Sequence, residues 1–250
     1  MNDYLSAATQ AARTAGALLK EHFEKELTVN EVDLHDIKLE LDVRSQELIT
    51  SILLEAFPQH AILGEEGIAG NQESPYQWIV DPIDGTVNFF YGIPHFCISI
   101  ALHHEGKAIA AVIYDPMRDE LWEAAKGEAT RLNGKPCKVS ARTKIGDAVV
   151  SVGFAKSSST IRTGLPLFEK MIYKVRKCRL MGSAALDLAY VASGRLDAYI
   201  ESTVNLWDIA AGRLLVEAAG GSVEVTPRED DPRKLSIVAT SGAMDLGLDD

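Results

Sequence analysis

Cysteine is scarce in this sequence. The 250 residues include only Cys97, Cys137 and Cys178, which are widely spaced and form no Cys-x-x-Cys pair. An odd number of isolated cysteines argues against a disulfide framework and against a cysteine-ligated zinc site. We interpret them as reduced thiols and expect the protein to work in a reducing compartment.

Positive charge is also in short supply. Lysine and arginine contribute 25 residues against 36 aspartates and glutamates, which gives a formal net charge of −11 at pH 7. A protein that holds nucleic acid through a basic face needs the opposite balance, so we expect no nucleic-acid partner. The same deficit means that a phosphorylated ligand would need its charge neutralised, which bound divalent cations would do.

Long hydrophobic runs are missing as well. The apolar stretch 108–114 is far too short to cross a bilayer, and charges interrupt any signal-peptide core within residues 1–23. These absences predict a cytoplasmic protein with no membrane partner. Because 46% of the residues are hydrophobic, the chain can still bury a sizeable core as a single domain over residues 1–250.

Apolar periodicity predicts the secondary structure. It indicates helices at 5–19 and 42–57, and strands at 61–63, 78–80, 96–102, 107–114 and 121–125. After residue 145, strands at 148–152, 178–181, 198–200, 222–225 and 237–240 alternate with helices at 165–175, 183–192 and 207–219. An α/β (α+β mixed) fold, in which helices cover mixed sheets, fits this order. We expect two packed lobes with a boundary near residues 143–147.

Acidic residues follow three of these apolar segments. Glu65 and Glu66 come after the strand at 61–63, Asp81 and Asp84 follow the strand at 78–80, and Asp208 opens the last helix. Taken singly, each has an ordinary explanation: a solvated loop, a tight turn or a helix cap. A helix cap would also explain Asp42.

In combination, these residues indicate a metal site. Side chains at strand ends converge in α/β folds, and Asp81 and Asp84 bracket Ile83, whose carbonyl would point between them. Carboxylates and a backbone carbonyl, without His or Cys, are the ligands that a hard cation such as Mg²⁺ prefers. The N–H groups of Gly85 and Thr86 would face a phosphate if they open a helical turn.

Three segments resemble the signature blocks of the inositol monophosphatase family. They are Gly64-Glu65-Glu66, the twelve residues from Trp78 to Phe89 (WIVDPIDGTVNF) and the six residues from Trp207 to Gly212 (WDIAAG). They occur in the family's order and at similar spacing, and the resemblance runs nearly from end to end. It implies a layered αβαβα sandwich, two or three Mg²⁺ ions, a phosphatase that lithium often inhibits, and a homodimer.

The resemblance also implies roles for individual residues. The implied metal ligands are Glu65, Asp81, Asp84, Asp208 and the Ile83 carbonyl, with Glu66 near an outer, more weakly held ion. The residues implied to orient and deprotonate the attacking water are Asp42, Glu65 and Thr86. The implied substrate-binding residues are Asp84, Gly85, Thr86, Ser183, Ala184, Glu201 and Asp208.

Two positions depart from the family pattern. Lys38 stands where a small or apolar residue is usual, and Glu31 stands where several members have a lysine in a mobile loop. These differences bear on substrate choice and on the third metal ion more than on the core chemistry. We interpret Lys38 as a solvated charge at an edge.

The sequence therefore predicts a magnesium-dependent phosphomonoesterase for a small polyol or sugar phosphate, with myo-inositol monophosphate as the default. Histidinol phosphate, fructose 1,6-bisphosphate and phosphoadenosine phosphate are handled by relatives with similar metal sites and remain alternatives. A haloacid-dehalogenase-type phosphatase would need Asp-x-Asp-Gly-Thr, whereas Asp81 stands three residues before Asp84. A binding or scaffold protein on a retained phosphatase fold is the alternative from another class.

Overall fold

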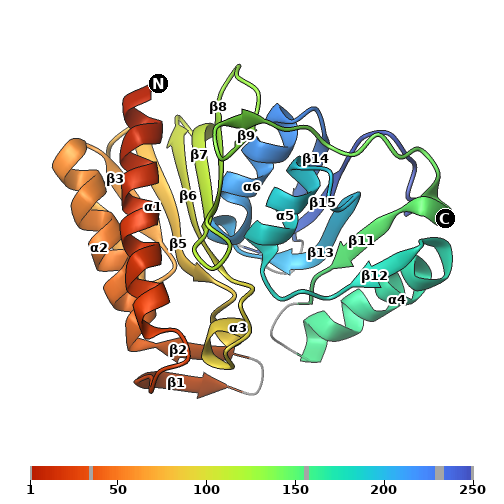
Figure 1. The fold of residues 1–250 in the computed structure, drawn as a ribbon, viewed down its shortest axis with the longest axis horizontal. Coiled ribbons are helices and arrows are strands. Elements are labelled where there is room, and N and C mark those ends of the chain that lie inside the picture. Colours follow the sequence, from red (N-terminus) through yellow and green to blue (C-terminus); the bar gives the residue numbers. More distant parts are fainter. Residues whose placement is uncertain (1, 34–35, 155–157, 229–233, 249–250) are drawn as a thin grey trace.

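The computed structural model describes residues 2–33, 36–154, 158–228 and 234–248, which form five layers (Figure 1). Helices α1 (Asn2–His22) and α2 (Glu40–Ala56) cover one face of an eight-stranded sheet. Helices α5 (Ala184–Ala192) and α6 (Leu206–Ala218) lie between this sheet and a five-stranded sheet. Helix α4 (Ser158–Lys174) packs on the second sheet from outside. The order of layers confirms the predicted αβαβα fold.

The first sheet has the strand order β10-β9-β8-β7-β6-β5-β3-β4, in which only β3 and β5 are parallel neighbours. Its strands are β3 (Ala61–Gly64), β4 (Gly67–Gly70), β5 (Tyr76–Asp84), β6 (Cys97–His104), β7 (Lys107–Asp115), β8 (Glu120–Ala125), β9 (Arg131–Leu132) and β10 (Lys135–Pro136). A short helix, α3 (Thr86–Phe90), follows β5 directly.

The second sheet has the order β12-β11-β13-β15-β14 and also mixes strand directions. Its strands are β11 (Val149–Val152), β12 (Lys177–Arg179), β13 (Ala198–Val204), β14 (Ser222–Pro227) and β15 (Leu235–Thr240). A separate hairpin joins β1 (Val29–Asp33) to β2 (Asp36–Leu39). A single 3₁₀ turn, Ile145–Asp147, precedes the second sheet.

The pattern of buried residues explains why these segments form helices and strands. Helix α1 buries Ala8, Ala11, Ala15 and Leu19 at helical spacing, and the small side chains let the helix lie close to the sheet. Strand β6 is buried at every position from Cys97 to Leu102, since helices cover both faces of the first sheet. No helix in the described part of the chain combines the length and apolarity needed to cross a membrane.

The predicted helices and strands are confirmed, with the largest boundary difference in α4, which begins at Ser158 rather than residue 165. The hairpin β1–β2 was not predicted because it is short, charged and largely exposed. Glu31 and Lys38 are cross-strand partners in this hairpin, and both are exposed. The two-lobe boundary at 143–147 stays a prediction: the segment separates the two sheets in sequence, but α5 and α6 pack against both.

Candidate active site

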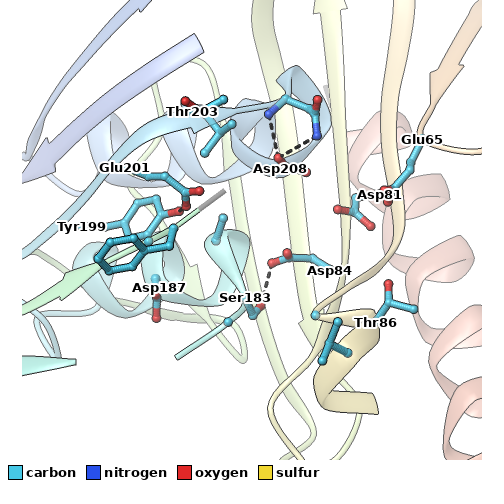
Figure 2. Close-up of a pocket in the computed structure, with 18 of the residues that line it drawn as sticks. Glu65, Asp81, Asp84, Thr86, Ser183, Asp187, Tyr199, Glu201, Thr203 and Asp208 are labelled. Carbon is cyan, nitrogen blue, oxygen red and sulfur yellow. Dashed lines mark hydrogen bonds between the residues drawn. The ribbon is translucent and has the colours of Figure 1, made fainter. Parts of the chain in front are cut away.

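The ends of two neighbouring strands bring the first acidic residues together. In the parallel pair β3–β5, Gly64 lies opposite Val80, and the Glu65 N–H donates to the Val80 carbonyl at 3.1 Å. In a regular strand, residues three apart point to opposite faces. The register of β5 with β6, however, shifts between Asp81 and Asp84. Both carboxylates and Glu65 consequently line the same cavity (Figure 2).

The turn that carries Glu65 is held by a glutamine from α2. Gln46 Oε1 accepts from the Glu66 N–H at 2.9 Å, and Gln46 Nε2 donates to the Gly67 carbonyl at 3.2 Å. A Cβ on Gly64 would lie 2.0 Å from Gln46 Oε1, so this position must be glycine for the amide to pack as it does. Glu66 does not line the cavity.

The start of α5 fixes one oxygen of Asp84. The hydroxyl of Ser183 and the N–H of Ala185 both donate to Asp84 Oδ2, each at 2.6 Å. Ser183 Oγ also accepts from the Leu186 N–H at 3.4 Å and thereby caps the helix. These bonds attach a carboxylate of the first sheet to a helix from the second half of the chain.

A buried carboxylate lies behind the strand ends. The Thr86 hydroxyl is within hydrogen-bond distance of Asp42 Oδ1 (3.2 Å) and of the Ile83 carbonyl (2.9 Å). Asp42 Oδ2 accepts from the Leu39 N–H at 2.8 Å, so this residue caps α2 and also contacts Thr86. Gly85, at φ = 99°, turns the chain into the expected helical turn.

Asp208 reaches the same cavity from the start of α6. Its Oδ2 accepts from the backbone N–H (2.7 Å) and the side-chain Nδ2 (3.2 Å) of Asn205 (Figure 2). Asp208 is the third residue of the helix, where a carboxylate satisfies the N–H of the capping residue and interacts favourably with the helix dipole.

These side chains surround a cavity of about 220 Å³. Of the predicted positions, Glu65, Asp81, Ile83, Asp84, Gly85, Thr86, Ser183, Ala184, Glu201 and Asp208 line it. Asp42 and Glu66 do not, although Asp42 contacts the lining residue Thr86. The structure thus gathers most of the predicted site in one place.

Comparison with known proteins shows the family to which the chain belongs. Residues 1–247 match the model of the inositol monophosphatase family. The chain belongs to the inositol monophosphatase family. This confirms the predicted relationship.

Relatives in the family include proteins named SuhB and proteins named inositol monophosphatase. Nus factor SuhB of Pseudomonas aeruginosa is 41% identical over 231 residues, which cover 89% of this chain and 85% of that protein. The extragenic suppressor protein suhB of Bartonella henselae has a similar structure, with 36% identity, a TM-score of 0.88 and coverage of 96% of this chain and 94% of the other. Inositol monophosphatase of Anabaena (Nostoc) sp. PCC 7120 gives 37% identity, a TM-score of 0.84, and 96% and 91% coverage.

The donor set fits the magnesium on which the inositol monophosphatase family generally depends. Burial raises the pKa of Asp81 well above its ordinary value, and repulsion from Glu65, Asp84, Asp208 and Asp42 adds to this. A cation among these oxygens would relieve the repulsion. Within the described residues, no three carboxylate, thiol or imidazole groups already form a closed metal cluster. The carboxylates surround the cavity instead.

The far wall of the cavity contains two further acids, the buried Asp187 and the half-buried Glu201. Burial raises the pKa of Glu201 to about 8, an effect that the hydrogen bond from the Tyr199 hydroxyl partly opposes. Burial also raises the pKa of Asp187 to about 8, again partly opposed, here by a hydrogen bond from Ser151 at 2.6 Å. In the metal-free protein both carboxyls therefore take up a proton at a higher pH than an ordinary acid does.

Five polar residues of the lining were not predicted from the sequence: Asp187, Tyr199, Thr203, Asn205 and Lys234. An isolated acid in the apolar segment 184–192 was a signal that could have identified Asp187, because an acid there is costly to bury. Of the other four, Tyr199 and Thr203 belong to β13, Asn205 follows this strand and Lys234 directly precedes β15. Their sequence neighbourhood has no pattern that distinguishes a cavity wall from a sheet edge.

Proposed function

We propose that the protein is a magnesium-dependent phosphomonoesterase that hydrolyses a small phosphomonoester with a metal-activated water. The observation that carries the proposal is the single cavity in which Glu65, Asp81, Asp84 and Asp208 lie with Ile83. Carboxylates and a carbonyl suit Mg²⁺, which also binds substrate phosphates. Without cations, such an acidic cavity would repel a phosphate.

The chain's own residues would divide the remaining tasks. Two or three Mg²⁺ ions, when bound, would neutralise phosphoryl charge, activate the water and stabilise the departing alkoxide. Thr86 and Asp42, already in contact, would orient the attacking water, and Glu65 would help to take its proton. Ser183 and Ala184 would bind substrate on the α5 side of the cavity.

The test is phosphate release from a panel of phosphomonoesters, measured with Mg²⁺ and again after chelation. The panel contains myo-inositol 1-phosphate, histidinol phosphate, fructose 1,6-bisphosphate, phosphoadenosine phosphate and an aryl phosphate. We expect turnover that requires Mg²⁺. If no panel member is hydrolysed with Mg²⁺, the proposal is wrong. Lithium sensitivity, the homodimer and the cytoplasmic location remain predictions.

Glu201 is the residue that we propose selects a hydroxyl-rich substrate. It lies on β13 across the cavity from the metal-site carboxylates, and its carboxyl accepts from the Tyr199 hydroxyl (Figure 2). A carboxylate in this place would accept hydrogen bonds from ring hydroxyls, and such bonds contribute about 1.5–3 kcal/mol.

We expect Glu201→Gln to lower kcat/KM for myo-inositol 1-phosphate by roughly 10–150-fold, the range that these energies imply. Burial raises the pKa of Glu201 in the metal-free protein, and bound Mg²⁺ would oppose this shift by favouring the ionised form. The loss should grow as the pH rises and the wild-type carboxyl ionises, because its protonated form resembles the amide. Hydrolysis of an aryl phosphate is the control and should change little. Equal losses on both substrates would show that Glu201 supports the metal site or the fold.

A second candidate role is suggested by a relative's name. The Pseudomonas relative is called a Nus factor, a name that belongs to transcription, and this is in tension with our expectation of no nucleic-acid partner. We infer a binding role only as the second candidate, because a net charge of −11 disfavours a basic RNA-binding face. Gel-shift assays with RNA, for the wild type and a catalytically inactive variant, would separate a binding role from hydrolysis.

A further inference from the structure

The second sheet contributes one positive charge to an otherwise acidic cavity. Among the described residues that line it, six have carboxyl groups and Lys234 alone is basic. Lys234 directly precedes β15 and is half-buried. Because this lysine lies beside a proposed phosphate site, a ligand that binds there could also contact it.

Hydrogen bonds from the neighbouring strands place this lysine. The Arg228 N–H donates to the Lys234 carbonyl at 2.9 Å and continues the β14–β15 pairing. The Arg228 guanidinium turns toward β13, where it donates to the Ser202 carbonyl (3.1 Å) and to Thr203 Oγ1 (2.8 Å). The two cations therefore have different roles: Arg228 braces β13, and Lys234 reaches the cavity.

Among the described residues, the hydrogen-bond partner of the Lys234 ammonium group is neutral. Its Nζ donates to Asn205 Oδ1 at 2.5 Å, which is a neutral acceptor. In the part of the chain that the structure describes, Lys234 forms no ion pair with a carboxylate. An ammonium has three N–H donors, and its strongest bonds are to anions. An anionic group of a ligand would supply this partner.

The same asparagine separates Lys234 from the proposed metal site. Asn205 Oδ1 accepts from Lys234, and its Nδ2 donates to Asp208 Oδ2 at 3.2 Å. The phosphate to be cleaved would lie with the metal ions at Asp208 and the other carboxylates. Lys234 is therefore placed to contact a different part of the substrate.

We propose that Lys234 binds a second anionic group, a phosphate or a carboxylate, on the alcohol portion of the substrate. The inference rests on the proposed phosphatase function and narrows its substrate class. The preferred substrate is then a phosphoester with a further negative charge, such as a polyol bisphosphate. myo-Inositol monophosphate has no such group and would leave Lys234 without an anionic partner.

Two pairs of probes that differ in one anionic group test the proposal. They are myo-inositol 1-phosphate against the 1,4-bisphosphate, and glycerol 2-phosphate against 2-phosphoglycerate, the second pair testing a carboxylate. In each pair, kcat/KM for the probe with two anionic groups is divided by kcat/KM for the probe with one. We expect Lys234→Gln to lower this ratio by about 10–100-fold in at least one pair, mainly through KM. Lys234→Arg should retain most of the preference.

Lys107→Gln is the matched control, because Lys107 is exposed at the opposite end of the first sheet. Equal losses on both members of each pair would mean that Lys234 acts through Asn205 on Asp208, and an unchanged kcat/KM on every probe would mean a solvated lysine. Either result overturns the proposal. If the wild type hydrolyses neither the probes nor any member of the phosphomonoester panel, the proposed function fails separately. Binding of 2-phosphoglycerate and of glycerol 2-phosphate, measured by calorimetry with Mg²⁺, is then the test. Weaker binding of 2-phosphoglycerate alone in Lys234→Gln supports the subsite, and an effect that does not differ between the two ligands overturns it.

Discussion

Asp84→Asn is expected to abolish magnesium-dependent phosphate release while the fold is retained. Asp84 lies at the centre of the proposed metal site, and the amide would remove a charged oxygen ligand without changing the shape of the side chain. Loss of several kcal/mol of metal-derived stabilisation of the transition state corresponds to a rate reduction on the order of 10³-fold or more. The measurement is kcat over a range of Mg²⁺ concentrations.

The fold should survive because the amide oxygen can still accept the bonds that Ser183 and Ala185 now donate to Asp84. Thermal unfolding in the absence of Mg²⁺ checks this. Asp3→Asn, at an exposed position in the first turn of α1, removes the same charge far from the strand ends and should leave turnover unchanged. Near-normal turnover of the Asp84 variant at limiting Mg²⁺ would contradict the assigned metal site.

Thr86→Ala is expected to lower kcat by ~10²–10⁴-fold, the usual range for residues that orient or deprotonate a nucleophile. Its effect on Mg²⁺ affinity should be small, because Thr86 contributes a hydroxyl rather than a carboxylate. Asp42→Asn should show a similar loss, since the Thr86 hydroxyl is in contact with Asp42 Oδ1. The double variant should lose far less than the product of the single losses.

Thr86→Ser keeps the hydroxyl and is the matched control, with kcat expected near that of the wild type. The asparagine at position 42 can still accept the Leu39 N–H, so the cap of α2 should persist and the fold should be unaffected. If the losses multiply in the double variant, Thr86 and Asp42 act independently, and the proposed pair is wrong.

Local sequence signals predicted much of this protein. Alanine and leucine at helical spacing predicted α1, and apolar runs predicted the strands of both sheets, because burial on one or both faces sets these periods. The hairpin β1–β2 was not predicted because its strands are short and charged, and only Ile37 and Leu39 among its described residues are buried. At the site, the Asp-Pro-Ile-Asp-Gly-Thr segment indicated carboxylates at a strand end, and the structure shows that both line one cavity.

The sequence by itself determined the α/β class and the acidic residues available to hold a cation, because these depend on composition and short-range pattern. Its signature segments indicated the family, and this resemblance implied the layered fold. Only the tertiary structure decided how the acidic residues meet. The register shift in β5 turns Asp81 and Asp84 toward one cavity, and α5 supplies the donors that hold Asp84. The pairing of β13 with β15 brings Lys234 to Asn205, 29 residues away in sequence. Such contacts depend on strand register and helix packing across the whole core, which no local pattern specifies.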